Sequence, residues 1–194
     1  LIILVSSFDS RGYLGGDIFA LKPSLKWYIE FVSSHPFING LIISFFVGII
    51  SSLLSVLISL STAYAVVRYE FPGKNFLVET LMAPAVVPGV TIGFSLLYFF
   101  ASIKFPFAIL KIIIAHVIIT LPYALRTLIA ALEGFDISIE EAALVLGATR
   151  FKAFVHVVLP NIKTGIIAAF IFSFAISLDD VAVTAFLTDI YTYT

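Results

Sequence analysis

The sequence predicts an all-α fold, a polytopic bundle of transmembrane helices that forms one domain over residues 1–194. Hydrophobic residues make up 61% of the chain, charged residues only 12%, and the mean hydropathy is +1.14. A soluble domain carries about 25% charged residues. The apolar residues also gather in runs of about 20, the length that a helix needs to cross roughly 30 Å of hydrocarbon. Lipid offers no partner for free backbone groups, so each run is expected to be helical.

Four runs are long and apolar enough to span a membrane, at about 38–67, 77–101, 105–125 and 164–187. Residues 1–5 are expected to be the end of a further, partial span, and the polar residues 189–194 have no span after them. The chain is therefore expected to be a fragment, truncated at both ends.

Lysine and arginine in the loops indicate which side of the membrane each loop occupies. The loop at 68–76 is compact and basic, and Arg126 and Lys163 lie at the ends of predicted spans, where this bias counts most. We therefore expect the loop at 68–76 and the long loop at 126–163 to be cytoplasmic. The loop at 6–37 then faces outward.

The long loop is expected to hold two short helices joined at a glycine. Ser138 and Glu141 have the spacing of a capping box, in which Ser138 caps the first helix and Glu141 reaches back to its amide. Gly147 follows that helix, where a left-handed conformation costs glycine little. Thr149 is expected to cap the second helix. Pro160 is expected to close it and to start the next span.

Two interpretations of this loop are open from its residues. The apolar face of the second helix is expected to consist of Phe151, Phe154, Val155 and Val158. Such a loop can be an ordinary connector on the membrane surface. It can also dock another protein, because Ala142 and Ala143 allow a close approach and Glu141 offers a charge to an arginine.

The spacing within this loop resembles a family motif. The residues that carry it are Glu141, Ala142, Ala143, Gly147, Leu159 and Pro160, with Val157 where isoleucine is usual. They resemble the EAA loop of binding-protein-dependent ABC-transporter permeases. The resemblance implies a fold like that of type I ABC importer permeases, in a bacterial inner membrane. It also implies that these six residues, which we call the EAA residues, dock an ATPase subunit on the cytoplasmic side.

The resemblance extends along most of the chain. Arg68 to Lys74, Met82 to Pro88 and His116 to Arg126 resemble further segments of the family, and Ser177 to Asp180 resembles the fifth span of spermidine/putrescine permeases. It implies a subunit that translocates a small solute, with spermidine or putrescine as the best guess. Ferric iron, thiamine and sulfate are alternative solutes. An ATP-independent secondary transporter is a more distant alternative, because it leaves the EAA residues unexplained.

The resemblance also implies partners, namely ABC ATPase subunits, a second permease subunit and an extracytoplasmic solute-binding protein, besides the membrane lipid. The chain itself is not expected to be an enzyme or to hold a cofactor, with ATP bound by the partner. Gly73-Lys74 is followed by Asn75, and Arg68 stands where the first glycine of a P-loop would be. The net charge of −1 argues against a nucleic-acid partner.

Four residues within the apolar runs are candidates for the solute path. Asp179 and Asp180 are costly in lipid, so they are interpreted either as a cation-attracting pair or as caps of a following helix. Pro84 and Pro88 must kink or unwind their span, either to line a path or simply to pack a bent helix. His116 is expected to form interhelical hydrogen bonds rather than to carry protons. No second His or carboxylate lies at metal spacing on its helix, so a metal site is unsupported.

Overall fold

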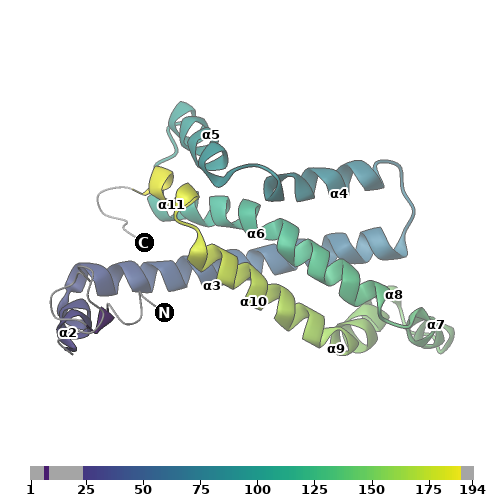
Figure 1. Ribbon diagram of the computed structural model, residues 1–194. Helices are drawn as coiled ribbons and strands as arrows, with labels where there is room; N and C mark the ends of the chain where they lie inside the picture. The colour runs from purple at the N-terminus through teal and green to yellow at the C-terminus, as the bar shows by residue number, and fades with distance from the viewer. Residues whose placement is uncertain (1–6, 9–23, 189–194) are drawn as a thin grey trace.

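The computed structural model describes residues 7–8 and 24–188. Within these residues all regular structure is helical, as the sequence predicts, and no strand is present (Figure 1). The partial span predicted at 1–5 lies outside the described residues. The described helices are α2 (Lys26–Ser33), α3 (His35–Arg68), α4 (Lys74–Met82), the 3-10 turn η2 (Ala83–Ala85), α5 (Gly89–Ser102), α6 (Ala108–Glu133), α7 (Ile137–Val145), α8 (Arg150–Ala153), the π-helical turn η3 (Phe154–Val158), α9 (Leu159–Asn161), α10 (Lys163–Asp179) and α11 (Ala182–Leu187).

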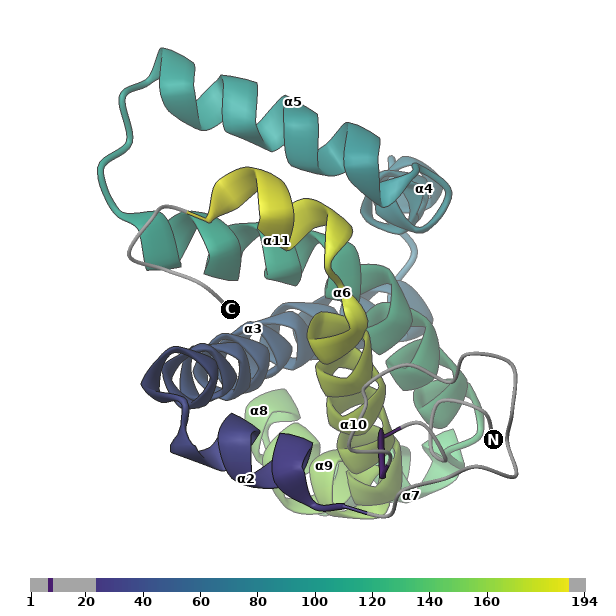
Figure 2. The ribbon, with the colours of Figure 1, turned by 60° about the vertical axis from the view of Figure 1, so that its left-hand side comes forward.

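Three helices, α3, α6 and α10, pack against one another and form the centre of the molecule (Figure 1). Helix α11 lies between α5 and α6, so α5 and α11 form a second layer beside this centre (Figure 2). By length and composition, α3 and α6 are the two unbroken described helices that could cross a membrane. The chain is therefore built around a few long apolar helices with shorter pieces attached.

Helix α3 covers the predicted span at 38–67, whereas α6 differs from the predicted span at 105–125. It begins at Ala108 and continues to Glu133, eight residues beyond the predicted end. The reason is packing, because Leu128 and Leu132 are fully buried among side chains of α3 and α10. The first residues of the predicted long loop are thus part of a spanning helix.

The run at 77–101 is broken rather than continuous. The segment of α4 and η2 meets α5 at 104°, and Figure 1 shows the sharp bend between them. Pro84 lies at the start of η2, and Pro88 stands directly before α5 with an extended ψ of 134°. Proline has no N–H to donate and disfavours helical conformation in the residue before it. The predicted effect of the two prolines is confirmed.

Two further boundaries differ from the predicted ones. Pro160 lies inside α9, and the next long helix begins only at Lys163, after a bend of 71°. The Asn161 side chain donates to the carbonyl of Val157 at 2.7 Å, which helps to end the helical run before that bend. The run at 164–187 is also divided, because α10 ends at Asp179 and α11 is a separate short helix.

Buried serines bring α3 close to the other central helices. Ser51, Ser55 and Ser59 are spaced four residues apart on α3 and are fully buried. The Ser55 hydroxyl is 2.7 Å from Thr120 Oγ1 on α6, and Ser59 donates to the carbonyl of Leu121 at 3.3 Å. Small hydroxyl side chains let helices approach closely in a membrane and hydrogen-bond across the interface. The position of α6 against α3 is fixed in this way.

Candidate functional site

The short helix α7 carries the first three EAA residues, and its cap differs from the predicted one. The Asp136 carboxylate accepts a hydrogen bond from the Ser138 amide at 2.9 Å, and the helix begins at Ile137. This bond lowers the pKa of the Asp136 carboxyl, since it favours the charged form. The predicted capping box of Ser138 and Glu141 is therefore wrong, because Asp136, two residues upstream, caps the helix instead.

The predicted glycine joint is confirmed. Gly147 has a φ of +90°, in the left-handed region. Its amide donates to the carbonyl of Leu144 at 3.0 Å, and the Ala148 amide donates to the carbonyl of Ala143 at 3.0 Å. This pair of bonds is a Schellman motif, which satisfies carbonyls at the end of α7. Thr149 then caps α8 as predicted, accepting from the Lys152 amide at 3.3 Å.

The EAA residues are mostly accessible. Glu141, Ala142, Gly147 and Pro160 are exposed, while Ala143 and Leu159 are half-buried.

The predicted apolar face of the following helix is wrong at Phe151, which is 75% exposed. Ala153 is buried in its place, because the helix turns its smaller side chain toward the bundle. The exposed surface of α8 thus includes the large apolar side chain of Phe151.

Glu140 is the functional candidate that the sequence pattern did not reveal. It is the only buried residue of α7. One carboxylate oxygen lies 2.9 Å from Nε of Arg68, at the end of α3, and the other accepts from the hydroxyl of Tyr64. The available signal was the pair Tyr64 and Arg68, four residues apart at the end of an apolar run.

Three of the four candidates for the solute path lie around one cavity of about 300 Å³. Pro84, Asp179 and Asp180 line it, together with Gly89 and Tyr123. Pro88 is not among its lining residues, although it directly precedes Gly89. The break between η2 and α5 therefore faces the break between α10 and α11. We call this space the Asp179 cavity.

The two neighbouring carboxylates have different roles in the structure. Asp180 caps α11, and its Oδ2 accepts from the amides of Val183 at 3.1 Å and Thr184 at 3.2 Å. Asp179 is exposed, and its carboxylate forms no hydrogen bond or ion pair with any residue that the structure describes. The capping interpretation thus holds for Asp180 and not for Asp179.

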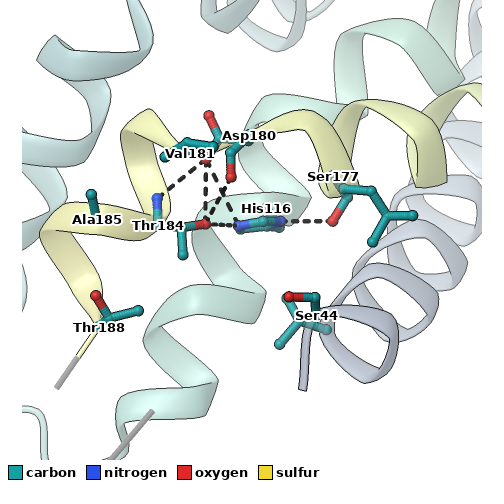
Figure 3. Close-up of a pocket in the computed structure, with 10 residues that line it drawn as sticks. Ser44, His116, Ser177, Asp180, Val181, Thr184, Ala185 and Thr188 are labelled. Carbon is teal, nitrogen blue, oxygen red and sulfur yellow. Dashed lines mark hydrogen bonds and ion pairs between the residues drawn. The ribbon is translucent and has the colours of Figure 1, made fainter. Parts of the chain in front are cut away.

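A second cavity of about 360 Å³ lies on the other side of Asp180, and Figure 3 shows its polar lining. His116 is buried there between α10 and α11. Its Nδ1 lies 2.7 Å from Ser177 Oγ and its Nε2 lies 2.8 Å from Thr184 Oγ1 (Figure 3). The predicted interhelical role of His116 is confirmed. No cluster of metal-ligating side chains occurs among the described residues.

Comparison with known proteins identifies the family. Residues 19–192 match the family described as binding-protein-dependent transport system inner membrane component. The spermidine/putrescine transport system permease protein PotC of Escherichia coli is 29% identical over 188 residues, covering 97% of this chain and 70% of that protein. PotC of Haemophilus influenzae is 30% identical over 191 residues, covering 98% of this chain and 73% of that protein.

A relative with a different solute in its name is similar to the same degree. The molybdenum transport system permease protein ModB of Escherichia coli is 31% identical over 166 residues, covering 79% of this chain and 72% of that protein. The family match extends over nearly the whole described structure, including α7, the Asp179 cavity and the cavity around His116. The chain therefore belongs to the family of binding-protein-dependent transport system inner membrane components, as a permease subunit of an ABC importer for a small solute.

Proposed function

We propose that the solute is a polyamine such as spermidine or putrescine, taken up with ATP hydrolysed by a separate subunit. The observation that carries this proposal is the carboxylate of Asp179. It faces a cavity formed where two helices are broken, and no described side chain neutralises it. The relatives named for spermidine and putrescine transport are consistent with a cationic solute.

The chemistry of the Asp179 cavity favours a cation over an anion. Its lining residues include two carboxylates, Asp179 and Asp180, and no lysine, arginine or histidine. Tyr123 also lines this cavity, and an aromatic side chain can attract a positively charged amine. A carboxylate also forms charge-assisted hydrogen bonds with ammonium groups. An anionic solute such as sulfate would be repelled by both carboxylates.

We also propose that the EAA residues dock the ATPase subunit on the cytoplasmic side. Glu141 and Ala142 are exposed on α7, and Gly147 lets the chain turn directly after it. Closure of the ATPase dimer on ATP would draw the docked helices together and turn the cavity outward, and hydrolysis would let it relax inward. A second permease subunit and an extracytoplasmic binding protein complete the proposed assembly in the membrane.

The solute proposal is tested by Asp179→Asn in the transporter assembled with its ATPase and binding protein in vesicles. Uptake of radiolabelled spermidine and putrescine is expected to fall roughly tenfold or more, since a charged hydrogen bond to the solute is lost. Thermal stability should be unchanged, because Asp179 has no partner within the described residues. Unaltered polyamine uptake, or saturable uptake of an oxyanion instead, would refute a cationic solute.

The docking proposal is tested by Ala142→Glu and Gly147→Pro. Both are expected to abolish ATP-driven uptake while the chain still inserts into the membrane. Asn75→Glu is the matched control, since Asn75 is exposed in the other predicted cytoplasmic loop and lies outside the EAA residues. Normal uptake in Ala142→Glu and Gly147→Pro, with the ATPase subunit still bound, would exclude the docking role.

A further inference from the structure

We propose that the ion pair between Arg68 and Glu140 is the mechanical link through which movement of α7 reaches the spanning helix α3. This inference rests on the proposed docking of the ATPase at the EAA residues. It adds a route: Glu140 carries a displacement of α7 to the end of α3, a helix that packs extensively against both α6 and α10. Arg68 and Glu140 are thus positioning residues for transport, without contact to solute or nucleotide.

Helix α7 is attached to α3 through charged side chains rather than through apolar packing. Glu140 is the only buried residue of α7, and the other residues of this helix are exposed or half-buried. The side chains of Arg68 and Glu140 are 9% and 7% exposed, and Nε lies 2.9 Å from Oε2. Tyr64, one turn earlier on α3, donates to the other oxygen of the same carboxylate. Both oxygens of Glu140 are therefore held by α3.

Neighbouring contacts converge on the same end of α3. The ring of Tyr64 lies 4.6 Å from the ring of Phe154 in η3. The Arg68 guanidinium lies over the ring of Phe135, 5.7 Å from its centre, in the segment that leads into α7. The next residue along the chain after α3, Tyr69, accepts a hydrogen bond from Arg150 at 3.0 Å. The segments on both sides of α7 are thus fastened to one point.

A buried ion pair is a weak source of stability but a strong positional constraint. Replacing such a pair by apolar side chains of similar volume is often neutral or stabilising, whereas removing one partner leaves an uncompensated buried charge. An apolar contact at this point could slide when α7 is displaced. A carboxylate held at both oxygens cannot move without moving the arginine and tyrosine that hold it. Replacing the pair by apolar side chains should therefore keep the packing at this point and remove the mechanical link.

The decisive variant replaces both partners, Arg68→Leu with Glu140→Leu, in the transporter assembled with its ATPase subunits and binding protein in vesicles. The apolar pair is expected to fold and to keep the ATPase bound, because packing is retained. Solute uptake per ATP hydrolysed should fall roughly tenfold, a typical size for coupling between two sites. Glu140→Gln should lower the same ratio.

The matched control is the exposed ion pair of Glu70 and Lys74, 2.7 Å apart near the same end of α3. Glu70→Gln should leave uptake per ATP unchanged, because exposed pairs contribute little. Normal uptake per ATP in the apolar double variant would overturn the link. Loss of ATPase binding in that variant would also overturn it and assign Glu140 to docking. Failure of the docking proposal gives a different result, namely normal uptake in the Ala142→Glu variant, in which Arg68 and Glu140 are intact.

Discussion

His116 Nε2 lies 2.8 Å from Thr184 Oγ1, which ties α6 to α11 beyond the break at Asp180. The other ring nitrogen lies 2.7 Å from Ser177 Oγ on α10, before the break. A single buried imidazole therefore holds both sides of the elbow between α10 and α11. The Asp179 cavity depends on that elbow, because Asp179 is the last residue of α10.

Thr184→Val should loosen this elbow. The substitution keeps the shape of the side chain and removes the hydroxyl, so one ring nitrogen of His116 loses its partner. Hydrogen bonds between helices in a membrane contribute about 0.6 kcal/mol on average, and an unmet buried group adds to the loss, so about 1 kcal/mol is expected. Thermal unfolding in detergent measures it. Thr184→Ser retains the hydroxyl and should remain within a few tenths of a kcal/mol of the unaltered protein.

The close approach of α5 to α11 depends on Gly93. A Cβ atom there would lie 2.8 Å from Phe186, 3.1 Å from the backbone of Val183 and 3.3 Å from the carbonyl of Ala182. Because two of these neighbours are backbone, Gly93→Ala should push the helices apart and cost about 1–3 kcal/mol.

Gly89→Ala, on the same helix, is the control for this substitution. Its added Cβ would meet Ala182 at 3.4 Å, an ordinary contact. The unfolding midpoints of Gly93→Ala and Gly89→Ala in detergent should therefore differ clearly. Equal midpoints would show that α11 can move away without loss.

Much of the fold could be predicted because the apolar runs are long and because a single run in lipid can satisfy its backbone hydrogen bonds only as a helix. The left-handed Gly147 and the cap at Thr149 were predictable from local chemistry alone. The two prolines also indicated a break, since missing amide donors act locally. These features depend on residues that are neighbours in the sequence.

What could not be predicted depends on residues that are distant in the sequence. Nothing near Glu140 indicates that Arg68, 72 positions away, would neutralise it in a buried site. Asp179 and Asp180 were equivalent in sequence, and only the direction of α11 assigned the capping role to Asp180. The end of α6 could not be predicted either, because Leu128 and Leu132 are kept helical by packing against side chains of α3 and α10.

Gly147→Ala tests the joint after α7. Open space surrounds the position, so the cost arises only from the φ of +90°, which an L side chain rarely adopts. The helical end is expected to lose about 1 kcal/mol, seen as faster amide hydrogen exchange in α7. Gly134→Ala is the matched control after α6, where φ is −77° and the added Cβ makes ordinary contacts. The same increase in both variants would contradict a conformational origin.

The cap at Asp136 predicts an acid-dependent loosening of α7. The Ser138 amide holds the pKa of this carboxyl below its usual value, so its stabilising effect is complete above the unfolded pKa of about 3.9 and is lost as the pH falls through the lower folded pKa. Protection of the first α7 amides, corrected for intrinsic exchange, should thus be constant from about pH 7 to 5 and decline below about 4.

Asp136→Asn isolates this effect from those of the other carboxylates. Asparagine caps a helix about as well as aspartate but does not titrate. Its α7 amides should therefore lack the part of the acid decline that arises from position 136, whereas Asp136→Ala should show weak protection of the first turn already at neutral pH. An identical acid decline in the unaltered protein and in Asp136→Asn would show that titration of Asp136 is not its cause, and that the Asp136 cap has no measurable influence on the helix.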